Sequence, residues 1–184
     1  MSCLSEETCQ YLADYRNIVQ NMIMEMTSAE LDCSISHNFI SQMIPHHRAA
    51  IEMSENILKY SNNSNIRRIA ENIIAERTAS IEAMQSIEDC TKGLLNCKHD
   101  LHCYQCCICE IMRKMFCCMK NAGCSDCVDK NFLCEMIPHH RGAVQMSCEA
   151  LKQCLCCELK PIIQDIVRSQ RKGINEMCCL LKCF

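Results

Sequence analysis

Residues 39–54 read FISQMIPHHRAAIEMS, and residues 132–147 read FLCEMIPHHRGAVQMS. Apolar residues recur at helical spacing through both stretches, for example Phe39, Met43 and Met53 on one face of the first. Each stretch nevertheless carries a proline directly before two adjacent histidines. The pattern therefore predicts a helix that keeps a helix-breaking residue beside a pair of imidazoles, and predicts it twice.

The proline has two possible places in such a helix. Proline is tolerated at the first helical position, so the helix could begin at Pro45. The residue before it, Ile44, is a poor cap, and the apolar pattern begins earlier, at Phe39. We therefore favour an interior proline, which frees the carbonyl of Ser41 four residues back and bends the helix. The same reasoning applies to Pro138 in the second stretch.

The whole chain reads as one unit used twice. The motif recurs after 93 residues, and so do apolar positions on both sides of it. Apolar spacing predicts three helices in each unit, at residues 5–27, 36–60 and 64–90 and at residues 98–121, 126–153 and 156–183. We expect an all-α, antiparallel helical bundle built from two three-helix repeats, residues 1–93 and residues 94–184. One six-helix bundle and two smaller bundles both fit the pattern.

The composition of the sequence argues against two classes of partner, nucleic acids and membranes. The 184 residues include 19 basic and 22 acidic ones, and no basic stripe indicates a nucleic-acid partner. No stretch resembles a signal peptide or a membrane span, so we expect a cytosolic protein.

Histidine and methionine share one face of each motif helix. Met43 lies four residues from His47, and His46 lies seven from Met53. Imidazole with thioether suits Cu(I) and tolerates Zn(II). The alternative is a hydrogen-bonded core histidine packed by methionines. The candidate ligands are Met43, His46, His47 and Met53 with their counterparts Met136, His139, His140 and Met146.

The pattern F-x-x-x-M-I-P-H-H-R-x-A-x-x-M, followed later by I-x-x-M, resembles the ferritin-like bacterial family called domain of unknown function 305. The resemblance implies a helical bundle and, for some members, copper binding or tolerance through these histidines and methionines. The first unit departs from the family, with Ser36 where an acidic residue is usual and Arg77 where glutamine is common. The second unit has Asp129 and Gln170 there. The absence of Glu-x-x-His from the sequence argues against a di-iron site.

Cysteine is the outlier in composition, with 21 residues, of which only Cys3, Cys9 and Cys33 precede residue 90. Without an export signal we expect most to be thiols. The set Cys103, Cys106, Cys124 and Cys127 has the spacing of a zinc site, although so many cysteines produce such spacing by chance. Most cysteines of the second unit stand where the first has polar residues, as in the pairs Cys107/Asp14, Cys118/Glu25, Cys134/Ser41 and Cys178/Gln85.

A helical wheel gathers several thiols on the face opposite the apolar one. We call Cys103, Cys106, Cys107, Cys117 and Cys118 the thiol stripe, and His99 lies on the same face. Burial as small hydrophobes explains this placement poorly. The stripe is expected either to bind Cu(I) or Zn(II) or to form an interface, and drift in composition without function is the third alternative.

These observations favour a cytosolic protein that buffers, stores or confers tolerance to a soft metal, Cu(I) before Zn(II). The alternative is a structural or assembly protein, a possible homo-oligomer, that uses thiol-rich helix faces as an interface. We do not expect an enzyme, because the sequence shows no βαβ pattern around its Cys-x-x-Cys pairs and no catalytic Cys/His/Asn grouping. Beyond a metal ion, we expect neither a nucleic acid nor a membrane as partner.

Overall fold

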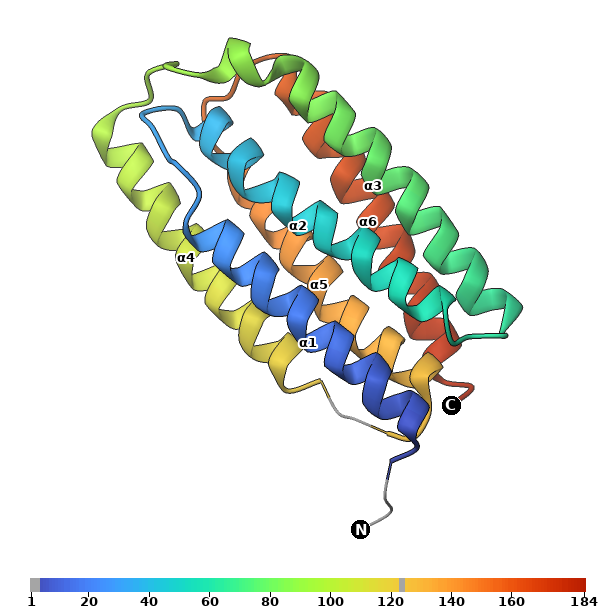
Figure 1. Ribbon diagram of the computed structural model, residues 1–184. Coiled ribbons are helices and arrows are strands. Elements are labelled where there is room, and N and C mark those ends of the chain that lie inside the picture. Colours follow the sequence, from blue (N-terminus) through green and yellow to red (C-terminus); the bar gives the residue numbers. More distant parts are fainter. Residues whose placement is uncertain (1–3, 123–124) are drawn as a thin grey trace.

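The computed structural model describes residues 4–122 and 125–184, which form a bundle of helices (Figure 1). The helices are α1 (Glu6–Thr27), α2 (Ile35–Leu58), α3 (Ser64–Thr91), α4 (Lys98–Lys120), α5 (Val128–Ala150) and α6 (Leu159–Leu181). Consecutive helices run in opposite directions (Figure 1). The predicted all-α antiparallel bundle is confirmed. In the described part of the chain, every helix is too short or too polar to cross a membrane.

The helix ends follow from local capping. Ser5, Ser34 and Asn63 precede α1, α2 and α3, and their side chains accept hydrogen bonds from backbone N–H groups of the first turns. The predicted ends agree with the structure to within three residues. One of the largest differences is at the start of α6, which begins at Leu159, whereas the predicted helix begins at residue 156. This start places Pro161 in the first turn, where its missing N–H leaves no helical hydrogen bond unmade.

Both motif prolines lie inside their helices. Pro45 is in the middle of α2, which begins at Ile35, and Pro138 is in the middle of α5. The interior placement is confirmed. The histidine pairs that follow the prolines therefore lie halfway along the bundle, away from its loops.

The six helices form one bundle. Helix α2 packs against α1 and α3, α5 packs against α4 and α6, and α2 and α5 pack against each other at the centre. Helix α3 also contacts α6, and α1 contacts α4 (Figure 1). Each helix of the first unit thus meets its counterpart in the second. The predicted boundary between the units falls in the connection between α3 and α4.

Methionine supplies much of the buried core. The buried methionines are Met22, Met26, Met43, Met53, Met84, Met112, Met115, Met119, Met136, Met146 and Met177. The flexible thioether side chain adapts to irregular gaps between helices. The four motif histidines are buried in the same interior, so imidazole and thioether groups share the centre of the bundle.

Candidate metal centre

The two copies of the motif meet where α2 packs against α5. The ring of His46 stacks on the ring of His139, with centroids 3.7 Å apart and planes inclined by 28°. Each ring lies 5.9 Å from its own neighbour, His47 or His140. The four side chains, which we call the histidine centre, are at most 1% exposed. The structure therefore joins the two predicted histidine sites into one buried cluster.

Most ring nitrogens of the histidine centre have no hydrogen-bond partner. The Nε2 atom of His47 is 3.1 Å from Ser80 Oγ, and His139 donates from Nε2 to the His46 carbonyl at 3.1 Å. Within the described residues the unpaired nitrogens are His46 Nδ1 and Nε2, His47 Nδ1, His139 Nδ1, and His140 Nδ1 and Nε2. A buried polar group without a partner costs about 1–3 kcal/mol. A metal ion that bound those of the six nitrogens that carry a lone pair would recover part of that cost.

Burial keeps all four imidazoles neutral. Desolvation lowers the pKa of each one, and the pKa of His139 falls to about 3. The guanidinium of Arg77 adds to this effect at His47 and His140, whose pKa values lie well below the ordinary range. A neutral imidazole is the form that ligates a metal ion. The donors are therefore ready without losing a proton.

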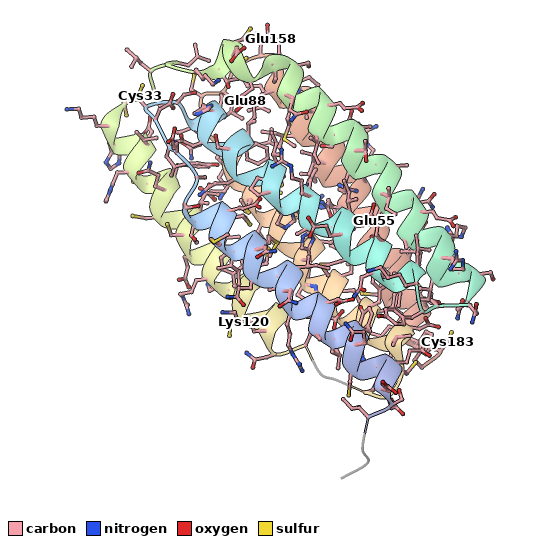
Figure 2. The ribbon with its side chains drawn as sticks, in the orientation of Figure 1. Cys33, Glu55, Glu88, Lys120, Glu158 and Cys183 are labelled. Atoms are coloured by element: carbon pink, nitrogen blue, oxygen red, sulfur yellow. The ribbon has the colours of Figure 1, made fainter. Side chains whose placement is uncertain are left out.

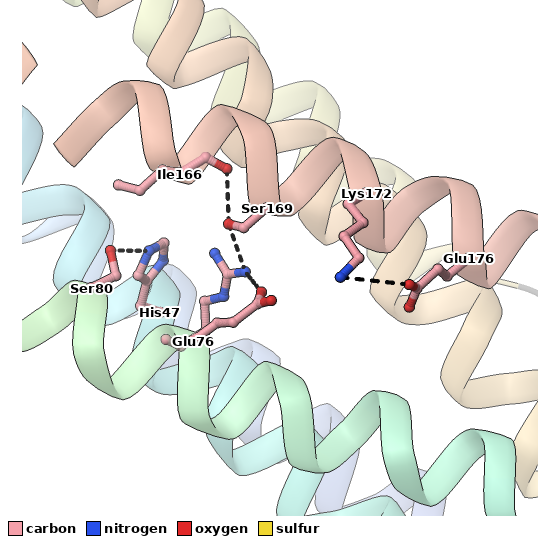
Figure 3. Close-up of polar contacts among 8 residues, drawn as sticks. His47, Glu76, Ser80, Ile166, Ser169, Lys172 and Glu176 are labelled. Carbon is pink, nitrogen blue, oxygen red and sulfur yellow. Dashed lines mark hydrogen bonds and ion pairs between the residues drawn. The ribbon is translucent and has the colours of Figure 1, made fainter. Parts of the chain in front are cut away.

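Arg77 places a permanent charge beside the histidine centre. Its side chain is 1% exposed, and one terminal nitrogen donates to Glu76 Oε2 at 2.8 Å and to Ser169 Oγ at 3.1 Å. Figure 3 labels these two partners. The counterpart of Arg77 in α6 is Gln170, which is equally buried and uncharged. A cation bound at the centre would therefore be repelled by Arg77 from the α3 side, whereas Gln170 adds no charge at the corresponding place in α6. Arg77, which stands where glutamine is common in the family, thus adds a positive charge that opposes cation binding at the histidine centre.

A second difference between the units lies one turn further along the same helices. In α3, Ser80 supplies the hydroxyl that contacts His47 (Figure 3). Its counterpart in α6 is Gly173, where an added Cβ would lie 3.2 Å from His140 Nε2. Glycine therefore leaves His140 Nε2 without a neighbouring hydroxyl. Neither Ser80 nor Gly173 was predicted as a site residue, although the Ser/Gly difference is visible when positions 93 apart are compared.

The donor types suit a soft ion, but they do not yet surround one. In residues 4–122 and 125–184, no three histidine, cysteine, aspartate or glutamate side chains are placed to hold one metal ion. The predicted thioether ligands are all at most 1% exposed, namely Met43, Met53, Met136 and Met146. A metal at the histidine centre would therefore need these thioethers or a change of imidazole rotamer to complete its ligand set.

The thiol stripe lies on the exposed side of α4. All five of its cysteines are exposed, as predicted. His99 Nε2 is 3.7 Å from Cys103 Sγ, and His102 Nε2 is 3.7 Å from Cys106 Sγ. Our prediction omitted His102, although its spacing of four residues before Cys106 was a usable signal. The structure therefore supplies two mixed imidazole–thiol pairs on neighbouring turns.

The zinc-like set of four cysteines does not come together. Cys103 and Cys106 lie in the first turns of α4, whereas Cys127 directly precedes α5 and is half-buried. Roughly 20 Å of helix separates Cys106 from the end of α4, near which Lys120 lies in Figure 2. Cys124 lies outside the described residues. The spacing of these Cys-x-x-Cys pairs therefore does not produce one site.

Comparison with known families identifies the chain. The model of the family described as "Domain of unknown function (DUF305)" matches residues 14–88 and 36–181, which together span most of the sequence. The chain belongs to the DUF305 family. A solved DUF305 fragment from Deinococcus radiodurans has the same fold, with 20% identity and a TM-score of 0.60, over 82% of this chain and 97% of that one. No curated protein matches the sequence.

Solved structures of a protein named CopM are also similar to this DUF305 chain. The apo form of CopM is 25% identical, with a TM-score of 0.61, over 81% of this chain and 97% of that one. The Cu(II)-bound form is 25% identical, with a TM-score of 0.60, over 81% of this chain and 98% of that one. CopM has also been solved with silver bound. A protein of this fold can therefore hold copper.

Proposed function

We propose that this DUF305 protein binds and buffers Cu(I) in the cytosol, with Zn(II) as a weaker alternative, and is not an enzyme. The observation that carries the proposal is the set of unpaired ring nitrogens in the buried histidine centre. The Cu(II)-bound form of CopM, which is 25% identical, supports it.

Two groups of donors would contribute to binding. The histidine centre offers neutral imidazoles among buried thioethers, and the thiol stripe offers exposed sulfur. Imidazole, thioether and thiolate together favour Cu(I) over harder ions. Thiols must lose protons to bind a metal, whereas the imidazoles are already neutral. Binding at the stripe should therefore weaken in acid sooner than binding at the centre.

The first test is the metal content of protein purified without oxygen from cells grown with copper and zinc, read with a thiol titration. We expect several copper equivalents per chain and thiols protected from titration. A variant with serine at all five stripe positions should hold less copper and keep its helical circular dichroism. A matched control replaces five other exposed cysteines, Cys90, Cys154, Cys157, Cys179 and Cys183, and should hold more copper than the stripe variant.

Other outcomes would contradict the proposal. If the purified protein holds no metal and its thiols are free, the proline–histidine motif serves helix packing and not metal binding. Metal-free protein with chains cross-linked through exposed cysteines would favour the assembly function instead. An unchanged copper content in the stripe variant would remove the stripe from the binding site.

The variant Arg77→Gln should strengthen copper binding at the histidine centre. It gives the first unit the uncharged residue that the second has at Gln170, and it removes the buried charge that repels a cation. We expect about a tenfold gain in Cu(I) affinity, which corresponds to ~1.4 kcal/mol. Competition with a Cu(I) chelator measures it. The control Arg68→Gln removes an exposed charge from the same helix and should change nothing. Equal Cu(I) affinities for Arg77→Gln and the unmodified protein would indicate that the metal does not bind at the histidine centre.

A further inference from the structure

Two surface grooves occupy corresponding places in the two units, each beside a motif proline. The groove next to Pro45 has a volume of about 550 Å³, and the groove next to Pro138 has a volume of about 600 Å³. The isoleucine, proline and arginine of the motif line both, ending at Arg48 in the first and Arg141 in the second. The two grooves are therefore the same surface, seen once in each unit.

Four of the positions that line both grooves differ in chemistry. At one of them Glu88 of the first groove is replaced by Leu181 in the second, and at the other three Glu25, Ser41 and Gln85 are replaced by cysteines, namely Cys118, Cys134 and Cys178. The three cysteines come from α4, α5 and α6, so they reach the groove from three separate helices. Cys118 is exposed, and the other two are half-buried. Each of these three changes to cysteine replaces an oxygen donor with a sulfur donor.

The surroundings of the second groove suit a thiolate-bound cation. Met115 lines it and adds a thioether, and Lys114 and Arg141 line it with positive charge. Three thiolates around one monovalent cation carry a net charge of −2, which those two side chains would offset.

We propose that this groove, here called the thiol groove, is a second soft-metal site in which Cys118, Cys134 and Cys178 bind Cu(I) or Ag(I) as thiolates. The inference rests on the proposed function but places one site away from the histidine centre, at the end of the thiol stripe, with which it shares Cys118. Each thiol releases one proton to solvent on binding, and the ion enters and stays monovalent. Because the described side chains do not yet surround one point, binding requires a change of cysteine rotamer, for which the groove leaves room.

Alkylation of the unmodified protein maps the site. Reduced, metal-free protein receives one equivalent of Ag(I), which does not oxidise thiols, and is then treated with iodoacetamide and analysed by peptide mass spectrometry. We expect Cys118, Cys134 and Cys178 to be protected together, relative to metal-free protein, while Cys90 and Cys154 stay reactive. Protection that appears first at Cys103 and Cys106, or evenly over all cysteines, would overturn the inference.

Matched variants test the same site in both directions. Replacing Cys134 and Cys178 with serine, which leaves all five cysteines of the thiol stripe in place, should lower the Ag(I) stoichiometry by about one equivalent. The control Cys90→Ser/Cys154→Ser/Cys183→Ser should not lower it. The variant Glu25→Cys/Ser41→Cys/Gln85→Cys builds the thiols into the first groove and should gain about one equivalent. If the serine variant fails to fold, the gain variant and the alkylation map decide.

The outcomes separate this inference from the proposed function. A chain that takes up neither Cu(I) nor Ag(I) contradicts both. A chain that binds metal at the histidine centre or the thiol stripe, with unchanged stoichiometry in both groove variants, contradicts the thiol groove alone.

Discussion

The metal-free protein is expected to lose about 5 kcal/mol of its folding free energy on acidification from about pH 7 to about pH 5. The cause is the histidine centre, whose four imidazoles are buried without charge. In the unfolded chain each imidazole has a pKa of about 6.5 and takes up a proton below that value. The folded protein cannot take up those protons until the pH approaches its own lowered pKa values.

The sign and size of the effect follow from proton linkage. A lowered pKa in the folded state gives full stability above the unfolded pKa and a loss as the pH falls below it. Four such groups cost about 5 kcal/mol per pH unit well below pH 6.5. Glu135, with its pKa raised to about 7, binds one proton in the folded state and opposes this. The net loss of about 4 kcal/mol per pH unit compares with a total stability of about 5–15 kcal/mol.

Urea denaturation at a series of pH values measures this loss. The double variant His46→Gln/His139→Gln removes two of the four buried imidazoles and should reduce the net slope of free energy against pH by about two-thirds, because Glu135 still opposes the two that remain. The exposed pair His99→Gln/His102→Gln is the matched control, and its slope should equal that of the unmodified protein. A stability that does not change between about pH 7 and pH 5 would contradict the neutral, buried state of the centre.

The variant Glu135→Gln should be more stable than the unmodified protein above about pH 7, by up to about 3 kcal/mol. Tyr11 donates a hydrogen bond from its hydroxyl to Glu135 Oε2 at 2.5 Å, but burial outweighs this contact and raises the pKa of the carboxyl from 4.5 to about 7. Stability is therefore lost as the pH rises from 4.5 through 7, because the folded state resists ionisation. Glutamine removes this loss and still offers an oxygen to Tyr11.

The sequence itself provides the control for this variant. The counterpart of Glu135 in the first unit is Gln42, which is also buried, so the fold accepts glutamine at this position. The reverse variant, Gln42→Glu, should lose stability above about pH 7. Measured against the unmodified protein, Glu135→Gln should gain more unfolding free energy at pH 8 than at pH 5. Gln42→Glu should instead lose more unfolding free energy at pH 8 than at pH 5. A gain for Glu135→Gln that is equal at both pH values would indicate better packing instead of removal of a buried charge.

The helices could be predicted because each helix has its own local pattern of apolar residues in the sequence. Apolar spacing located the helices, and the apolar pattern that begins before Pro45 already favoured an interior proline. The stacking of His46 on His139 could not be predicted in this way. Periodicity shows which face of a helix is buried, but it does not show which other helix covers that face.

The cysteines show the same limit. The wheel placed Cys103 and Cys106 correctly on an exposed face, because all residues of one helix share one geometry. The thiol groove was not predicted from the sequence, because Cys118, Cys134 and Cys178 lie on three helices whose relative positions are set by tertiary packing. The comparison with polar residues of the first unit had marked these positions without showing that they meet.

The contact between His46 and His139 joins residues that are equivalent in the two units. Separate molecules of one unit would have to find each other in solution to bury this face, and the pairing would depend on their concentration. Linking both units in one chain makes the encounter intramolecular, at an effective concentration of about millimolar. The histidine centre is therefore complete in every folded molecule, even when the protein is scarce.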